Sequence, residues 1–382
     1  MQILFVTPYY YPELEFGGPP KRLHALARKL ASRGHNVRVA TFDSRKPARR
    51  DSAVIDTITV QYIPWVGLRS RQIPTRMARL DCEVRGADLV HCYGLYNLLC
   101  PLAAALSRRA SVPFILEPMG MFVPRSRSLL AKRMYNSTLT KSMAKHAAAL
   151  VATSPLEAAE LKELTPDDVV VRRNGIDFEE FADLPDGQPM RQRWGVEVHE
   201  TLVVYFGRIS SKKNLHDLIA AFIKADVSRS KLVMAGPVSE PNYRHKLQAQ
   251  IDTAGQGKNI RLQGPLYGQE LKAAWAAADL FVLPSLNENF GNAAGEAVAA
   301  GVPVLLTETC GIAPIIHQRA GLAVPLGVEP LAEGLRLMLN PEVREQMTAR
   351  REEVKRELSW DEPVRQTERL YGQIIRGGRP QR

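Results

Sequence analysis

The chain has 382 residues, of which 45% are hydrophobic and 24% charged, with a formal net charge of +11. This length suits two domains of about 150 to 200 residues each, and the composition is that of an ordinary soluble globular protein. No stretch reaches the roughly 18 uninterrupted apolar residues of a membrane span, and the apolar run at residues 3–6 is too short for a signal-peptide core. We therefore expect a cytoplasmic protein.

The positive charge is confined to the first half of the chain. Residues 1–178 hold 26 Lys and Arg against 15 Asp and Glu, a difference of 26 − 15 = +11, whereas residues 179–382 hold 25 of each kind. This asymmetry predicts that the N-terminal half meets a polyanionic substrate or surface.

The residues that commonly bind metals show no metal-binding pattern. The four cysteines contain no C-x-x-C pair, the eight histidines have no metal-ligand spacing, and there is no Asp-x-Asp pair. Buried free thiols are expected instead of a disulfide framework, and we predict no metal site.

In chain order, strand and helix patterns alternate twice. An apolar strand pattern at 2–7 precedes a helical pattern at 23–30, and the same alternation returns near residue 201. We expect strands at 2–7, 36–41, 89–92, 114–116, 202–206, 231–235, 260–262, 280–283 and 302–306, with helices at 23–30, 95–107, 215–225, 243–254, 269–277 and 292–300. Alternation of this kind predicts two parallel sheets with helices on both faces, and the turn-rich residues 183–189 suggest a linker.

Two glutamates lie around the start of a predicted helix. The strand expected at 280–283 ends before a loop that carries Glu288, and Glu296 lies in the first turns of the next helix. The free amides at the start of that helix form a suitable site for a diphosphate, and the two carboxylates can hold sugar hydroxyls on either side. A capped surface helix with two solvated glutamates is the alternative.

Two cations follow the strand expected at 202–206. Arg208 and Lys213 leave this strand at the edge of the sheet where doubly wound folds bind ligands, and they can neutralise a departing diphosphate. Lys212 competes with Lys213 for this role, and a basic turn that caps a helix is the alternative.

Several segments resemble retaining glycosyltransferases of family 4, which have the GT-B fold. Residues 288–297 (ENFGNAAGEA) match the extended signature E-x-F-G-x-x-x-x-E-A, and residues 207–213 resemble the G-R-x-x-x-x-K segment, which favours Lys213 over Lys212. Residues 174–177 (NGID), 232–237 (LVMAGP) and 359–361 (SWD) resemble further family elements, so the likeness spans nearly the whole chain.

The resemblance implies two Rossmann-like domains that face a cleft. It places an acceptor-side domain at 1–178, a domain that binds the nucleotide sugar at 179–358, and a helix that crosses back to the first domain at 359–382. It implies transfer of a sugar with retention of configuration, without metal or cofactor, to a glycan or lipid-linked glycan in cell-surface polysaccharide or lipopolysaccharide synthesis. The implied catalytic residues are Arg208, Lys213 and Glu288.

The resemblance also implies a set of residues for binding the donor. Glu296 would hold the ribose, and Glu288 would position the sugar. The full donor set is Gly17, Gly18, Arg208, Lys213, Gly236, Phe290, Gly291, Asn292 and Glu296.

The loop after the strand at 114–116 departs from the family pattern. Many relatives carry His-Gly-Met there, with the histidine near the transferred sugar, but this chain has Met119-Gly120-Met121. A methionine cannot donate a hydrogen bond or move a proton. Glu117 is a candidate polar substitute in this sugar and acceptor loop, and the alternative is that it supports the loop.

A basic stretch in the first half suggests a membrane contact. Residues 118–156 contain no acid, and apolar residues are interleaved with six cations: Arg125, Arg127, Lys132, Arg133, Lys141 and Lys145. A basic amphipathic helix there would attract anionic lipid or a lipid-diphosphate-linked glycan, placing the protein at the inner face of the cell membrane. A solvated helix face is the alternative, and no recognition motif supports nucleic-acid binding.

Two other functions fit parts of the pattern. A nucleotide-sugar epimerase with the GT-B fold would share the donor site but need no acceptor. A catalytically silent scaffold that binds polyanions would explain the basic half and Met119. The presence of Arg208, Lys213, Glu288 and Glu296 argues against it.

Overall fold

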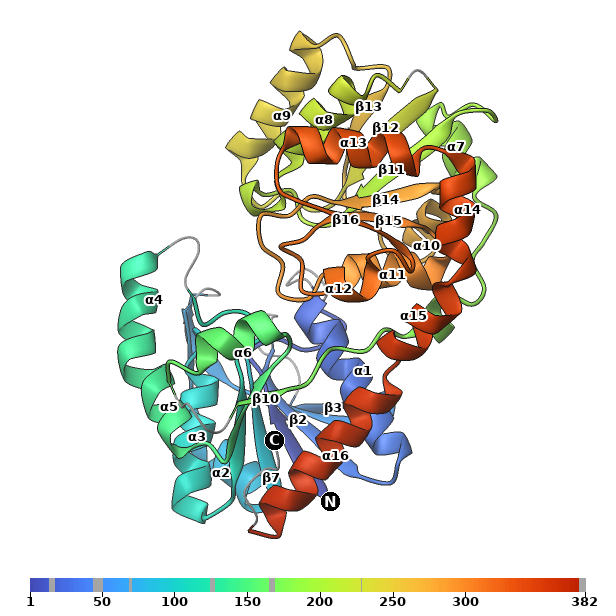
Figure 1. The fold of residues 1–382 in the computed structure, drawn as a ribbon. Helices are drawn as coiled ribbons and strands as arrows, with labels where there is room; N and C mark the ends of the chain where they lie inside the picture. Colours follow the sequence, from blue (N-terminus) through green and yellow to red (C-terminus); the bar gives the residue numbers. More distant parts are fainter. Residues whose placement is uncertain are drawn as a thin grey trace. The chain divides into compact units, whose positions relative to one another are not determined.

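The computed structural model describes residues 1–13, 18–43, 51–68, 71–123, 128–164, 169–227 and 229–377. The chain forms two compact units (Figure 1). Unit 1 contains Met1–Gly175 and Trp360–Arg382, and unit 2 contains Ile176–Ser359. The chain therefore passes between the units twice, after residues 175 and 359.

Unit 1 is built on a large, mainly parallel sheet. Its strands are β1 (Gln2–Val6), β2 (Asn36–Phe42), β3 (Ser52–Ile55), β4 (Ile58–Ile63), β7 (Leu89–Tyr93), β8 (Phe114–Glu117), β9 (Ala149–Ala152) and β10 (Val169–Val171), with a separate hairpin of β5 (Trp65–Leu68) and β6 (Arg71–Pro74). Its helices are α1 (Gly18–Ser32), α2 (Met77–Arg85), α3 (Leu99–Ala110), α4 (Leu129–Tyr135), α5 (Lys141–His146), α6 (Pro155–Leu161) and α16 (Asp361–Ile375). The strand order is β10-β9-β8-β7-β1-β2-β4-β3, and β3 alone among these pairs antiparallel, with β4.

Both faces of this sheet are covered. Side chains of β1 alternate between two apolar clusters, since Leu4 and Val6 belong to one and Ile3 and Phe5 to the other, as the two-residue strand period requires. Helices α2, α3, α5 and α6 contribute to the first cluster, whereas α1 and α16 contribute to the second. The sheet is therefore doubly wound, and the C-terminal helix completes one of its covering layers.

Unit 2 repeats the plan on a smaller scale. Its strands are β11 (Thr201–Phe206), β12 (Ser230–Ala235), β13 (Ile260–Gln263), β14 (Leu280–Leu283), β15 (Val304–Thr307) and β16 (Gly321–Val324). Its helices are α7 (Gln188–Trp194), α8 (Leu215–Ala225), α9 (Pro241–Thr253), α10 (Gly268–Ala277), α11 (Asn292–Ala300), α12 (Ala313–Ile316), α13 (Val328–Met338), α14 (Pro341–Ala349) and α15 (Arg351–Leu358), with short 3-10 turns at Phe178–Phe181 and Ser211–Lys213.

The strand order in unit 2 creates a switch point. The order is β13-β12-β11-β14-β15-β16, with every pair parallel. From β11 the chain winds outward to β12 and β13, and it then returns to β14 on the opposite side of β11. The neighbouring strands β11 and β14 therefore continue into connections that run in opposite directions, and the carboxyl ends of such a strand pair are where ligands of open parallel sheets bind.

The predicted α/β class with two doubly wound parallel sheets is confirmed, and several boundaries differ. The helix expected at 95–107 begins at Leu99, because the Asn97 side chain accepts the Cys100 amide at 2.8 Å and so caps the first turn. The strand expected at 302–306 begins at Val304, after Pro303, which has no amide hydrogen to donate. The sequence did not predict the hairpin β5–β6, the strands β3, β4, β9, β10 and β16, or the helices α2, α6, α7 and α12 to α15.

Candidate active site

The loop after β14 begins the candidate site. It runs from β14 to α11, and Gly291 at its end has φ +99, a left-handed conformation that favours glycine. A Cβ on Gly291 would lie 3.0 Å from Ile312 Cγ2 and 3.3 Å from Leu283 Cδ2. Gly291 therefore sets both the entry angle of α11 and the tight packing beneath the loop.

A second segment, which follows β15, fixes the shape of this loop. The Glu288 amide donates to Thr309 O at 3.1 Å, and the Gly311 amide donates back to Glu288 O at 2.9 Å. The hydroxyls of Thr307 and Thr309 both donate to Ser285 O at 2.7 Å. The Glu288 backbone is therefore held before any ligand arrives, as a preorganised site requires.

Lys213 and Glu288 come together at the switch point of unit 2. They lie 75 positions apart in the sequence, yet Lys213 Nζ donates to Glu288 Oε2, and the two side chains are only 19% and 20% exposed. The Leu286 amide also donates to Lys212 O at 3.0 Å, which joins the two loops through their backbones. From the sequence we expected each residue to follow the carboxyl end of a strand of this sheet, and in the structure their side chains are in direct contact.

Glu288 is ionised at neutral pH. Burial raises the pKa of its carboxyl group. The nearby Lys213 and Lys212 ammonium groups and a hydrogen bond from Ser285 lower the pKa by more than burial raises it, so the pKa lies below the ordinary value. The result is a fixed carboxylate beside a fixed ammonium group. Such a pair can exchange its internal contact for contacts to a charged, hydroxyl-rich ligand.

Arg208 lies at the same sheet edge with its side chain exposed. It follows β11, and among the described residues no hydrogen bond or ion pair engages its guanidinium group. Gly207 and Gly236 allow the ends of β11 and β12 to approach closely, because a Cβ on Gly236 would lie 1.8 Å from Gly207 O. Arg208 is therefore available to an anion outside the sheet edge.

Helix α11 presents the other predicted donor-site residues. Ala294 and Gly295 donate to Gly291 O, and no described residue accepts from the amides of Asn292 and Ala293. Asn292 Oδ1 is also buried without a partner among the described residues. Glu296 lies half-buried one turn further along. Phe290 is buried in the apolar core of unit 2, so its ring supports the loop from beneath.

The predicted sugar and acceptor loop follows β8 in unit 1. Met119 and Gly120 both have left-handed backbones, with φ +58 and +72. The Gly120 amide donates to Glu157 Oε1, while Glu157 Oε2 accepts from the Thr153 amide at 2.8 Å and the Thr153 hydroxyl at 2.9 Å. The buried Glu157 carboxylate thus ties this loop to the start of α6, where Ser154 caps the helix.

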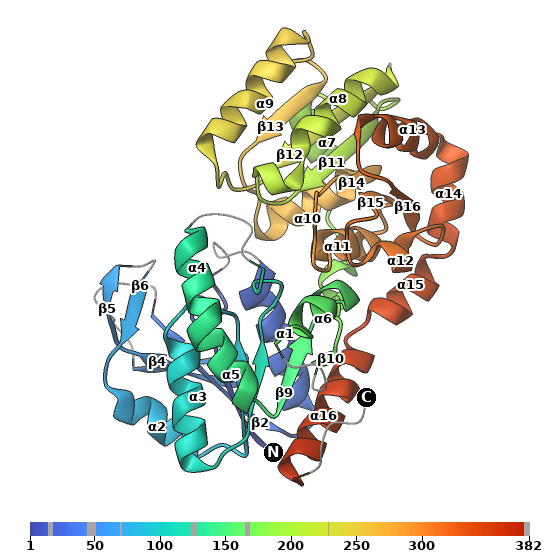
Figure 2. The same cartoon turned by 60° about the vertical axis from the view of Figure 1, so that its left-hand side comes forward.

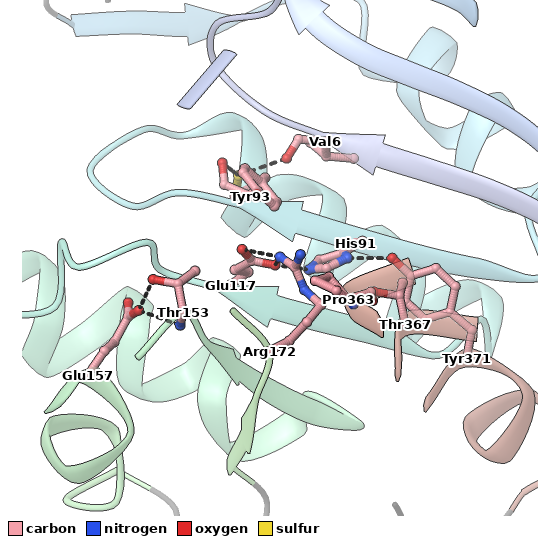
Figure 3. Close-up of polar contacts among 11 residues, drawn as sticks. Val6, His91, Tyr93, Glu117, Thr153, Glu157, Arg172, Pro363, Thr367 and Tyr371 are labelled. Atoms are coloured by element: carbon pink, nitrogen blue, oxygen red, sulfur yellow. Dashed lines mark hydrogen bonds and ion pairs between the residues drawn. The ribbon is translucent and has the colours of Figure 1, made fainter. Parts of the chain in front are cut away.

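Glu117 lies beneath this loop in a buried polar network (Figure 3). Arg172 Nη2 donates to both of its carboxylate oxygens, at 2.6 and 2.7 Å, and His91 Nε2 lies 3.3 Å from Oε2. His91 Nδ1 lies 2.6 Å from the Tyr371 hydroxyl on α16. Because Glu117 is fully enclosed and engaged by Arg172, the geometry favours the alternative in which it supports the loop.

Some predicted residues lie outside the described part of the chain. These are Gly17, Arg125 and Arg127, whereas Gly18 is the first residue of α1. Within the described ranges no helix is long and apolar enough to cross a bilayer, and no three or more His, Cys, Asp or Glu residues are grouped as metal ligands.

Comparison with known families places this geometry in context. A family model described as "Glycosyl transferases group 1" matches residues 187–355, which include Lys213 and Glu288, and one described as "Glycosyl transferase 4-like domain" matches residues 17–175. The chain belongs to the GT-B glycosyltransferases of family 4.

Individual relatives cover most of this glycosyltransferase. A D-inositol 3-phosphate glycosyltransferase of Nocardioides sp. is 26% identical over 93% of the chain and 85% of the relative. A GDP-mannose:cellobiosyl-diphosphopolyprenol alpha-mannosyltransferase of Xanthomonas oryzae pv. oryzae is 28% identical over 80% of the chain and 78% of the relative. The structure of Anabaena HepE in complex with UDP and glucose matches with a TM-score of 0.78 at 20% identity, over 97% and 99% of the two chains, and so shows the same fold.

Sequence reasoning missed three residues of this glycosyltransferase that hold its loops. Arg172, Glu157 and Thr309 each act on a segment that is distant in the chain or belongs to another element. A single charged or hydroxyl residue belongs to no periodic pattern, so its partner cannot be predicted from the sequence. For Thr309 the one available signal was its place in a threonine-containing turn after a strand.

Proposed function

We propose that this glycosyltransferase moves a sugar from a nucleoside-diphosphate sugar to a glycan or lipid-linked glycan with retention of configuration. Unit 2 would bind the donor and unit 1 the acceptor. The observation that carries the proposal is the Lys213–Glu288 pair, which stands at the switch point beside Arg208 and the first turn of α11. Cations, free amides and a carboxylate meet there, and a sugar diphosphate needs all three.

Each group has a separate task in the proposed reaction. The diphosphate takes the place of Glu288 as the partner of Lys213, while Arg208 and the amides of Asn292 and Ala293 bind its remaining oxygens. Their charge stabilises the diphosphate as the bond to the sugar breaks. Glu296 holds the ribose hydroxyls.

Glu288 then acts on the sugar. Once Lys213 turns to the diphosphate, the Glu288 carboxylate accepts hydrogen bonds from sugar hydroxyls and lies near the positive charge that develops on the ring. Its backbone is fixed by Thr309 and Gly311, so only its side chain must adjust. The lowered pKa keeps it ionised, and no covalent intermediate with the protein is required.

Neither a metal ion nor a cofactor is part of the proposal. Two side-chain cations and the first amides of α11 are placed to neutralise the diphosphate. An excess of EDTA should therefore leave turnover unchanged, and a loss that Mg²⁺ or Mn²⁺ restores would remove this part of the proposal.

The acceptor is proposed to be held near an anionic membrane, on the cytoplasmic side. Lys141 and Lys145 of α5 and Arg133 of α4 are exposed, and Leu130 and Met134 of α4 are 77% and 70% exposed. This side of unit 1 combines cations with exposed aliphatic groups, as a protein acting on lipid-linked glycans in cell-surface polysaccharide or lipopolysaccharide synthesis requires.

The experiment begins with the donor. UDP-, GDP- and ADP-sugars are screened for thermal stabilisation, because a bound donor raises the apparent stability by mass action. The donor that binds is then incubated with soluble sugar phosphates and with diphosphopolyprenol-linked glycans, and the anomeric configuration of the product is determined by NMR. An axial donor sugar should give an axial product. An inverted product would overturn the retaining mechanism, and donor conversion without acceptor would favour an epimerase.

A further inference from the structure

The hairpin β5–β6 stands apart from both large sheets. Its strands pair antiparallel, with Val66 opposite Ile73 and Leu68 opposite Arg71, and the Thr75 amide closes its base by donating to Pro64 O at 2.7 Å. Figure 2 shows it at the edge of unit 1. No predicted site residue lies on the hairpin, and the proposed reaction does not use it.

The two faces of the hairpin differ sharply. Trp65 and Gln72 turn inward, and the Trp65 indole donates to Asp43 O at 2.7 Å. Val66, Leu68 and Ile73 lie on the other face, because residues two apart on a strand and cross-strand partners share a face. These three side chains are 54%, 71% and 50% exposed. The inner face therefore anchors the hairpin, and the outer face is aliphatic and uncovered.

The surroundings of the hairpin are positively charged. Residues 57–80 contain four arginines and no acid, and Arg76 is exposed next to Met77, which is also exposed. The nearest acids in the sequence are already paired with cations: Asp51 with Arg79, Asp56 with His24 and Arg28, Asp81 with Arg85, and Glu83 with Arg38. The hairpin thus presents apolar groups beside Arg76, a cation with an exposed side chain.

The same combination occurs on α4, at a separate place in the sequence. Leu130 and Met134 are exposed there beside Arg133, within a stretch without acids. Trp65 of the hairpin and Tyr135 of α4 both pack against the same apolar cluster of unit 1. Both elements therefore lie on the face of the sheet that this cluster fills.

An anionic lipid bilayer fits this surface better than a protein partner. The exposed apolar groups of the hairpin and α4 are aliphatic, with none of the Trp or Tyr anchors that dominate protein interfaces, and aliphatic groups beside cations suit the interfacial region of an anionic leaflet. Two weak contacts on one surface hold a protein to a membrane more strongly than either contact alone, because the second forms at a high effective concentration. The hairpin and α4 supply two.

We propose that the outer face of β5–β6, with Val66, Leu68 and Ile73, is a second lipid-contacting element that acts together with α4. The inference rests on the proposed function only in taking α4 as the first membrane contact. The aliphatic side chains enter the interfacial region of an anionic leaflet, and Arg76 pairs with lipid phosphates. The hairpin adds binding strength and limits how unit 1 rotates on the membrane.

The test compares three variants of the full chain by sedimentation with vesicles. Leu68→Ser/Ile73→Ser alters the hairpin, Leu130→Ser/Met134→Ser alters α4, and Val198→Ser in unit 2 is the control, because Val198 is an aliphatic residue that is 91% exposed. Vesicles contain phosphatidylcholine either alone or mixed with phosphatidylglycerol. All the altered side chains are exposed, so each variant should keep the thermal unfolding temperature of the unaltered protein.

The unaltered protein should bind the mixed vesicles and bind pure phosphatidylcholine poorly. The hairpin and α4 variants should each bind mixed vesicles roughly tenfold more weakly, whereas the control should bind normally. Unchanged vesicle binding by the hairpin variant would overturn the proposal, and so would a change in its self-association without any change in vesicle binding. Donor-induced thermal stabilisation, measured in the same samples, reports on the donor site separately, so failure of the proposed function is recognised independently.

Discussion

Two Lys/Arg–Glu pairs stand at the carboxyl edges of the two sheets, and they differ in almost every physical respect. Glu117 in unit 1 is completely buried and accepts two hydrogen bonds from Arg172, whereas Glu288 in unit 2 is one-fifth exposed and shares one oxygen with Lys213. Burial makes the first pair costly to separate, but water or a ligand can reach the second. The comparison indicates that a pair at a sheet edge supports the fold when enclosed and can serve a ligand when partly open.

The largest effect should follow from breaking the enclosed pair. Arg172→Ala leaves the Glu117 carboxylate buried without its main partner, so the free energy of unfolding should fall by about 3–5 kcal/mol. Lys213→Ala, at the partly open pair, should lower it by about 1 kcal/mol or less. Denaturant titration measures both values. Equal losses in the free energy of unfolding would show that burial does not determine how strongly each pair stabilises the fold.

A smaller effect is expected at the tie between α6 and the loop after β8. Glu157→Ala removes the carboxylate that accepts from the Gly120 amide and from the Thr153 amide and hydroxyl, which should cost about 2–3 kcal/mol of stability. Because Met119 and Gly120 then lose their fixed conformation, the KM for the acceptor should rise while donor binding stays unchanged.

Ser154→Ala is the matched control for this tie. It removes the cap of the same helix, at a cost of about 1 kcal/mol, and leaves the bond from Gly120 to Glu157 in place. If both variants raise the acceptor KM equally, the effect comes from the helix and the role of the tie is refuted.

The smallest effect concerns the dependence of stability on pH. The pKa of Glu288 in the folded protein lies below its ordinary value of 4.5, so its pair with Lys213 stabilises the fold fully above that value. This contribution is lost as the pH falls through the lower, folded-state pKa. The stability difference between the unaltered protein and Glu288→Gln, measured by denaturant titration, should therefore be about 1 kcal/mol near neutral pH and shrink in acid. A difference in the free energy of unfolding that grows as the pH falls would contradict the lowered pKa of Glu288.

The same comparison shows what the sequence could predict. The contact between Lys213 and Glu288 could be anticipated because each follows a recognisable apolar strand, and strand order in a doubly wound sheet brings those two strand ends together. Arg172 could not be assigned to Glu117, because it follows the three-residue strand β10, which has no distinct pattern, and its partner lies 55 positions away. Sheet topology is readable from periodicity, whereas the partner of a single buried charge is not.

The hairpin β5–β6 escaped prediction for a related reason. It interrupts the alternation of strand and helix, and its aliphatic residues face outward rather than into a core. Apolar residues at two-residue spacing indicate a strand only when one face is assumed to be buried within the protein. That assumption fails where the uncovered face has another partner.

The most direct test of the account compares turnover of Lys213→Ala with that of its neighbour variant, Lys212→Ala, at saturating donor and acceptor. Lys213 Nζ holds the Glu288 carboxylate at the switch point, whereas Lys212 is exposed on the surface of the same turn. Removing a preorganised charge that stabilises the leaving group should lower turnover by about 100-fold or more for Lys213→Ala, while Lys212→Ala keeps most of its activity. Near-normal turnover by Lys213→Ala, or equal losses in the two variants, would contradict the assignment of the Lys213–Glu288 pair to the donor site.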